Sequence, residues 1–211
     1  MDAMGLGRFI AIEGGEGAGK STQARLLAEA LSLRGIACKV TREPGGTPGA
    51  EAIRSLLLDP PGEGWEPESE ALLFAAARAD HVARLIRPAL ARGDWVICDR
   101  FVDSSRAYQG AAGALGDEAV VALHAIGSSG LLPDLTLVLS VSPEGAARRL
   151  AARDGSHADA IGGRPAEYHA QVDAAFRAFA AADPERFALV DGDGPVEAVH
   201  ARIMAALERL C

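Results

Sequence analysis

The sequence predicts a doubly wound α/β sandwich built on a parallel sheet of about five strands. Apolar runs of strand length alternate with longer stretches of helical periodicity, which is typical of successive strand–helix–strand units. The runs do not alternate cleanly with polar residues, as expected for a parallel sheet that is covered on both faces. The predicted strands are residues 9–13, 37–41, 95–98, 135–141 and 187–190.

Helical patterns fill the intervals between these strands, with apolar residues three and four positions apart. No linker, repeat or low-complexity tract divides the chain, so a single domain over residues 1–211 is expected. Residues 60–62 and 110–116 are expected to be loops, and the small, polar segment 154–163 a mobile flap. The predicted helices are residues 22–33, 69–92, 117–126, 143–153, 167–182 and 195–210.

The first predicted strand leads into a glycine-rich loop that matches G-x-x-x-x-G-K-[ST] at residues 14–21. Glycines allow backbone N–H groups to turn inward, and the following helix N-terminus adds partial positive charge, so the loop predicts a phosphate cradle. Lys20 is expected to reach the β- and γ-phosphates, and Ser21 to bind Mg²⁺. The expected nucleotide contacts are Gly14, Gly15, Glu16, Gly17, Ala18, Gly19, Lys20, Ser21 and Thr22.

An acidic residue, Asp99, follows the third predicted strand, where a carboxylate associated with Mg²⁺ is expected. ATP hydrolases commonly place a glutamate next, to orient water, but here Arg100 follows. A cation at this position favours a second phosphate over an activated water. The alternative is an ordinary ion pair at the strand end. Ser21 and Asp99 are therefore the candidate metal ligands.

Phe74 and Arg78 lie four positions apart on a predicted helix and share one face, with three alanines between them. An aromatic ring beside a guanidinium suits a pocket for a nucleobase and a phosphate. The alternative is that Phe74 is a plain core residue.

Three arginines, Arg148, Arg149 and Arg153, precede the polar flap. Arginines on a closing lid neutralise the charge that phosphoryl transfer spreads over the equatorial oxygens, and they exclude water. The alternative is a solvated basic helix face.

The composition narrows the function further. A net charge of −8 argues against a broad nucleic-acid surface, and a chain without asparagine lacks the N-K-x-D element by which GTPases usually read guanine. No apolar run approaches the length of a membrane span, and residues 1–7 lack a signal-peptide core. Cys38, Cys98 and Cys211 lack metal-type spacing, and their odd number points to the reducing cytoplasm. The five histidines are expected on the surface or on helix faces.

These motifs occur together, in this order and spacing, in a known family. The segments R-E-P-G-G-T at 42–47 and A-Y-Q-G at 107–110 are more specific than the glycine loop. On these residues the chain resembles the bacterial thymidylate kinases from about residue 8 to about residue 207. The resemblance implies a three-layer P-loop nucleoside-monophosphate-kinase-like fold with a five-stranded parallel sheet and a short lid at about residues 148–165. The matching segments are 13–22, 41–47, 53–58, Phe74 with Arg78, 99–101, 104–110 and 133–136.

The resemblance also implies an activity: transfer of the γ-phosphate of ATP to dTMP, giving dTDP and ADP, with Mg²⁺ as cofactor, in a homodimer. It implies that Phe74 stacks on thymine, that Arg78 contacts the base or the monophosphate, and that Tyr108 packs on the sugar and disfavours a 2′-hydroxyl. The residues implied to bind dTMP are Glu43, Pro44, Arg54, Phe74, Arg78, Arg100, Ser105, Tyr108 and Gln109.

By the same resemblance, the catalytic residues are Lys20, Arg100, Arg153 and Glu16. The phosphate of dTMP is already an anionic nucleophile, so positioning and charge neutralisation replace a strong base. Glu16 matches a loop acid near the sugar and the attacking phosphate, and Arg148 matches an arginine that packs near adenine.

Two positions depart from the pattern of the family. Ala160 stands where an arginine commonly follows the lid aspartate, and Gln171 occupies a helix position that is often basic. Because the glycine loop itself carries no arginine, the lid is expected to supply the charge, from Arg153 or Arg164.

Two alternatives remain open from the sequence. One is another P-loop deoxynucleoside or nucleotide kinase. A deoxynucleoside has a neutral hydroxyl and would need a carboxylate base, for which Glu43 is the candidate, whereas Arg78 and Arg100 favour an anionic acceptor. A non-catalytic nucleotide-binding regulator on the same fold is the other alternative.

Overall fold

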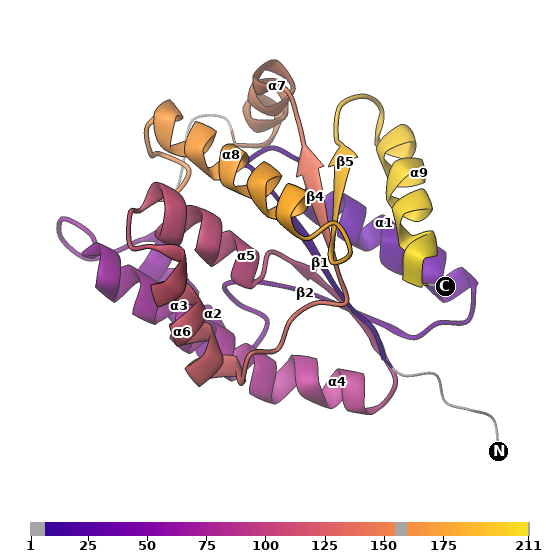
Figure 1. Ribbon diagram of the computed structural model, residues 1–211, viewed down its shortest axis with the longest axis horizontal. Helices are drawn as coiled ribbons and strands as arrows, with labels where there is room; N and C mark the ends of the chain where they lie inside the picture. The colour runs from indigo at the N-terminus through magenta and orange to yellow at the C-terminus, as the bar shows by residue number, and fades with distance from the viewer. Residues whose placement is uncertain (1–6, 155–159, 211) are drawn as a thin grey trace.

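The computed structural model describes residues 7–154 and 160–210, without the side chains of residues 152–154. Strands and helices alternate along most of the described chain (Figure 1). The elements are β1 Phe9–Gly14, α1 Lys20–Leu33, β2 Cys38–Arg42, α2 Pro48–Leu58, α3 Pro67–His81, η1 Val82–Ile86, α4 Arg87–Ala91, β3 Trp95–Asp99, α5 Val102–Ser105, η2 Arg106–Ala112, α6 Asp117–Ser128, β4 Leu135–Ser140, α7 Pro143–Asp154, α8 Ala166–Ala182, β5 Phe187–Asp191, α9 Val196–Leu207 and η3 Glu208–Leu210.

The strands form a five-stranded parallel sheet in the order β2-β3-β1-β4-β5. This confirms the predicted fold class. In the register of the sheet, Arg42 of β2 pairs with Asp99 of β3, and Ile12 of β1 also pairs with Asp99. The carboxyl ends of β2, β3 and β1 therefore lie at the same edge of the sheet, and the loops that follow them emerge together.

Alternate residues of β1 supply the cores on the two faces of the sheet. Ile10 and Ile12 pack with residues of α1 and α9 in one core, whereas Phe9 and Ala11 pack with residues of η1, α4 and β3 on the other side. Figure 1 shows the same layers, with α1 and α9 on one face and α3, α4, α6 and α8 on the other. The sheet is thus apolar on both faces, which explains why the strand sequences lack alternation.

The structure differs from the sequence prediction after β2 and β3. Helix α2 was not predicted, although Thr47 caps it by accepting a 3.3 Å hydrogen bond from the Ala50 N–H and Pro48 occupies its first turn. The prediction of a loop at 110–116 is wrong for residues 110–112, because α5 continues into the π-helical turn η2 as far as Ala112. Gly110 and its neighbours are helical because η2 packs between α6 and α8.

Within residues 7–154 and 160–210, no helix combines the length and the apolarity that crossing a membrane requires.

Candidate active site

Two cavities lie on either side of the glycine loop. The first, of about 270 Å³, is lined by residues that follow β2 and β3 and by α2, α3, α5 and η2. The second, of about 400 Å³, is lined by the loop, the start of α1, α7 and α9. Both cavities are lined by Glu16, Lys20 and Ser21. The loop therefore separates the two spaces at the side chains that were predicted to hold phosphate.

Positive backbone φ angles shape the loop. Gly14, Gly17 and Gly19 have φ values of 136°, 71° and 89°, which L side chains rarely adopt. A Cβ at Gly17 would lie 2.7 Å from the carbonyl oxygen of Ala146 in α7, so the loop and this helix touch. Arg149 of α7 also donates a 3.1 Å hydrogen bond to the Ala18 carbonyl.

Lys20 lies at the first turn of α1, and its ammonium is drawn back over the loop. Nζ donates to the carbonyl oxygens of Gly14 at 3.1 Å and Gly15 at 2.7 Å. Burial and the nearby Arg100 guanidinium lower the pKa of Lys20 to about 8. The ammonium thus lies at the point shared by the two cavities.

Ser21 and Asp99 meet although they lie 78 positions apart in the sequence: the Ser21 hydroxyl donates to the Asp99 carboxylate at 2.5 Å. A hydroxyl oxygen and a carboxylate oxygen are ligands that suit Mg²⁺. No group of three or more His, Cys, Asp or Glu side chains in the described part of the chain is placed to hold a metal ion by itself. The two oxygens would suit a Mg²⁺ that keeps several water ligands.

Arg100 follows β3 with a positive φ of 67°, an uncommon conformation for a residue with a side chain. Its guanidinium donates to the Gly14 carbonyl and to the Ser104 hydroxyl, both at 3.2 Å, and forms an ion pair with Glu16. It also lies 5.0 Å from the centre of the Tyr108 ring. Arg100 therefore reaches from the end of β3 to the glycine loop and lines the first cavity.

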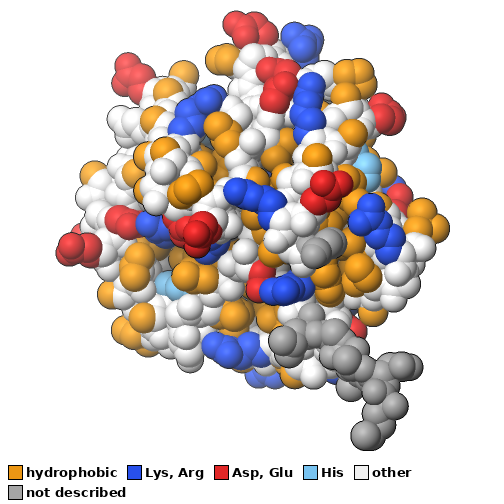
Figure 2. All heavy atoms as spheres, turned by 45° about the vertical axis from the view of Figure 1, so that its right-hand side comes forward, with side chains coloured by type: hydrophobic (Ala, Val, Ile, Leu, Met, Phe, Trp, Pro, Cys, Tyr) orange, Lys and Arg blue, Asp and Glu red, His pale blue; other side chains and the backbone are white. Residues whose placement is uncertain are grey.

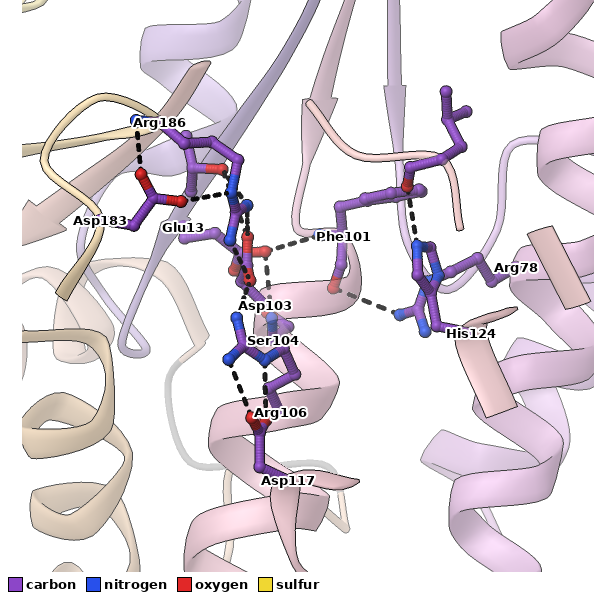
Figure 3. A network of polar contacts seen from close by, with 12 residues as sticks. Glu13, Arg78, Phe101, Asp103, Ser104, Arg106, Asp117, His124, Asp183 and Arg186 are labelled. Atoms are coloured by element: carbon purple, nitrogen blue, oxygen red, sulfur yellow. Dashed lines mark hydrogen bonds and ion pairs between the residues drawn. The ribbon is translucent and has the colours of Figure 1, made fainter. Parts of the chain in front are cut away.

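Glu13 at the end of β1 holds the chain after β3 in place through Phe101 and Ser104 (Figure 3). Its carboxylate accepts hydrogen bonds from the Phe101 N–H at 2.7 Å, the Ser104 N–H at 3.1 Å and the Ser104 hydroxyl at 2.6 Å. The side chain is fully buried. Burial, together with the nearby charge of Asp103, raises the pKa of Glu13 to about 7.

A second buried carboxylate, Asp103 of α5, connects this helix to the sheet (Figure 3). It pairs with Arg106 at 3.0 Å and with Arg186 at 2.8 Å. Arg106 also pairs with Asp117 at 2.7 Å, so α5, η2, α6 and the start of β5 share one charge network. The network fixes the helix that carries the wall of the first cavity.

The far wall of the first cavity is built on a chain of buried contacts. Arg78 donates to Glu43 at 2.7 Å and to the Ser105 hydroxyl at 2.9 Å. The other Glu43 oxygen contacts His81 Nδ1 at 2.9 Å, and His81 Nε2 contacts the Thr41 hydroxyl at 2.7 Å. Arg78 is thus held by Glu43, Ser105 and the Phe101 carbonyl rather than by solvent.

Aromatic and polar side chains complete this cavity. Phe74, Pro44 and Arg54 line it, and Arg54 donates to the Pro44 carbonyl at 2.8 Å. The Tyr108 hydroxyl is buried in the cavity wall, where it interacts with the Arg100 guanidinium.

The lid arginines take different places. Arg148 is exposed, whereas Arg149 lines the second cavity and also donates to the Gly192 carbonyl at 2.7 Å. Arg153 belongs to α7, but its side chain lies outside what the structure describes, as do residues 155–159 of the predicted lid. Arg164 pairs with Glu70 of α3. Arg164 thus meets α3 beside the first cavity.

The family model described as thymidylate kinase matches residues 12–203. The chain belongs to the thymidylate kinase family. The thymidylate kinase of Rhizorhabdus wittichii is 54% identical over 204 residues, which cover 97% of this chain and 98% of the relative. That of Chromohalobacter salexigens is 50% identical over 206 residues, which cover 97% of each chain. The crystal structure of thymidylate kinase from Ehrlichia chaffeensis matches with a TM-score of 0.78 at 31% identity, over 95% of this chain and 98% of that one.

These likenesses confirm the function predicted from the sequence. The chain is a phosphotransferase with thymidylate kinase function, on the three-layer fold of the P-loop kinases. The other nucleotide kinases and the non-catalytic regulator are therefore set aside.

Sequence reasoning missed several residues that shape the site. His81 was expected on the surface or on a helix face; it lies on α3 but is fully buried, three positions after Arg78. Glu70 lies one turn before Phe74 on the same helix, and its position on the face shared with Phe74 and Arg78 was the available signal. Of the arginines that the sequence proposed for the lid, Arg149 lines the second cavity and Arg148 does not.

The raised pKa of Glu13 predicts an unusual pH dependence of stability. The folded protein holds this proton up to about pH 7, whereas the unfolded chain releases it near pH 4.5, so the free energy of unfolding should fall as pH rises from about 5 to 8. Glu13→Gln should remove that loss. The difference in the free energy of unfolding between variant and wild type should therefore change by about 2–3 kcal/mol across this pH range. Urea titrations at pH 5 and pH 8 measure it, with Glu118→Gln on the exposed face of α6 as control. A difference that stays constant with pH would contradict the assignment.

Proposed function

We propose that this thymidylate kinase binds dTMP in the first cavity and ATP over the glycine loop in the second. The observation that carries the proposal is that Glu16, Lys20 and Ser21 line both cavities. A phosphate entering from each side would meet at these side chains. Transfer between two bound nucleotides needs such a meeting point, because the attacking and leaving oxygens lie roughly in line.

In the first cavity, the proposed roles follow from position. Phe74 stacks on thymine, and Tyr108 offers its ring to the sugar. Arg100 binds the monophosphate, with Arg54 at the same cavity and Arg78 held near the base by Glu43. The remaining proposed contacts with dTMP are Pro44, Ser105 and Gln109.

At the meeting point, the proposed chemistry is charge neutralisation. Lys20 and Arg100 offset the repulsion between two phosphate anions, and Glu16 orients Arg100 through their ion pair. Ser21 and Asp99 are proposed to hold Mg²⁺, which supplies further neutralisation of phosphate oxygens when it is bound. Arg149 extends positive charge over the loop, and Arg153 and Arg148 remain candidates for the transferred group and for adenine.

The arrangement of Glu43 disfavours a neutral hydroxyl as acceptor. Such an acceptor would need a free carboxylate base, but one Glu43 oxygen accepts from Arg78 and the other contacts His81. The carboxylate is therefore engaged in holding the wall of the cavity. An acceptor that already carries a negative charge agrees with this geometry.

We also infer a cytoplasmic homodimer that binds no nucleic acid. Exposed apolar side chains lie on two neighbouring helices, Leu72 on α3 and Val121 and Ile126 on α6, and they would suit a second copy of this chain. On the face shown in Figure 2, basic and acidic side chains are interspersed, unlike the continuous basic track that follows a nucleic-acid backbone.

The substrate assignment predicts a sharp separation of affinities. Arg100→Ala should lower kcat/KM for dTMP by about 10²–10³-fold, because one charge-stabilising donor is lost, and should leave the Kd for ATP within about twofold. Coupled ADP release with dTMP, dUMP, thymidine and dGMP measures activity, and calorimetry measures ATP binding. Arg92→Ala, at an exposed ion pair, is the control. Turnover of thymidine but not dTMP would overturn the proposed function, and equal losses for both nucleotides would overturn the role of Arg100.

The lowered pKa of Lys20 predicts that ATP binding weakens in mild alkali. Because the pKa of Lys20 is about 8 in the free protein, about nine-tenths of the Lys20 side chains are neutral amines at pH 9. The Kd for ATP should therefore rise about tenfold between pH 7 and pH 9. Lys20→Arg keeps its charge over this range, so its Kd should stay nearly constant. Calorimetric titrations at both pH values test this, and a wild-type Kd that does not change would rule it out.

The proposed assembly predicts a mass of about twice the 21.8 kDa of one chain. Val121→Glu should shift the protein toward the monomer, because it places a charge in the apolar contact. Light scattering after size exclusion measures the mass, and Leu33→Glu, exposed at the end of α1, is the matched control. A monomeric wild type would refute the dimer.

A further inference from the structure

A short chain of polar contacts extends outward from the base end of the first cavity. Gln109, which lines this cavity, donates from its amide Nε2 to one carboxylate oxygen of Glu70 at 2.8 Å. The other carboxylate oxygen of Glu70 pairs with the Arg164 guanidinium. Both Gln109 and Glu70 are buried. Each Glu70 oxygen thus serves one partner, and the three side chains join η2, α3 and the turn before α8.

The charge of Glu70 fixes which end of the Gln109 amide faces it. An ionised carboxylate only accepts hydrogen bonds, so it pairs with the amide NH₂ and repels the amide oxygen. A protonated carboxyl or a neutral side chain would accept either orientation. The second Glu70 oxygen is taken by the Arg164 guanidinium, in a charge-assisted ion pair that holds the carboxylate in place. The amide carbonyl Oε1 is then left for a ligand in the cavity.

Arg164 is itself fixed by a second contact on its own side of the cavity. It donates to the Tyr168 hydroxyl and lies 4.7 Å from the centre of the Tyr168 ring. The Tyr168 hydroxyl in turn donates to the Tyr108 carbonyl at 2.6 Å. Ile161, three residues before Arg164, lines the same cavity. Arg164 is therefore built into the base end of the site, away from the glycine loop that holds phosphate.

We propose that the Arg164–Glu70 ion pair is a positioning device for base selection, which orients the Gln109 amide so that its oxygen faces the acceptor nucleotide. Thymine and uracil carry a hydrogen on N3 and donate to such an oxygen. Cytosine presents an unprotonated N3, and its lone pair would oppose the oxygen. The pair thus selects an imide base over cytosine. This inference rests on the proposed function, because it requires the acceptor base to lie beside Gln109.

The test compares dTMP with dCMP in variants that break the pair. Arg164→Met removes the charge with little change in length, and Glu70→Gln replaces the obligate acceptor by an amide. In each variant the ratio of kcat/KM for dTMP to that for dCMP should fall at least tenfold, because the Gln109 amide is free to turn. The KM for ATP should stay within about twofold. Arg25→Met, which breaks an exposed ion pair on α1, should leave both quantities unchanged.

Coupling between the two positions gives a second readout. Because both residues act through one contact, Glu70→Gln should cost little further discrimination in the Arg164→Met background. An unchanged dTMP-to-dCMP ratio in folded single variants would overturn the inference. So would a loss of kcat with the ratio preserved, which would make Arg164 a lid arginine acting on the phosphates. If one single variant fails to fold, the other decides. A wild type inactive on dTMP would instead sink the proposed function, and calorimetry with dTMP and dCMP would then test base selection directly.

Discussion

Three strands end side by side, and the rest of the site depends on this constraint. The parallel register places the ends of β2 and β1 against the end of β3. The glycine loop, Glu43 and Arg100 leave the sheet there, within reach of one another. Parallel strands in a doubly wound sheet bind ligands at this edge because the connections diverge there.

Charged side chains crowd this edge, and most of them are held by partners from other elements. Arg100 is braced by Glu16 and Ser104, and Ser104 by Glu13. Arg78 is braced by Glu43, which is itself braced by His81. A buried charged side chain with a fixed partner keeps one conformation, so its geometry is set before a ligand binds. Such preorganisation lowers the reorganisation that phosphoryl transfer would otherwise require.

The sheet and the glycine loop were predictable because local patterns encode them. Apolar runs mark β1 to β5, and a contiguous motif marks residues 14–21. Helix α2 after β2, and α5 with η2 after β3, were missed because each is short and is stabilised by contacts with other elements. Glu13 and His81 were missed for a similar reason: their roles arise from partners 88 and 38 residues away. The role of Glu70 likewise depends on an arginine 94 residues further along the chain. No spacing rule reports such pairings.

The contact between Gly17 and Ala146 links the glycine loop to α7 as a matched pair of surfaces. A side chain of any size at position 17 would displace the helix that carries Arg149. A loop transplanted from a relative with a bulkier residue there would therefore need its own α7 to accompany it. The two segments form one exchangeable module, and in chimaeras the boundary belongs outside both.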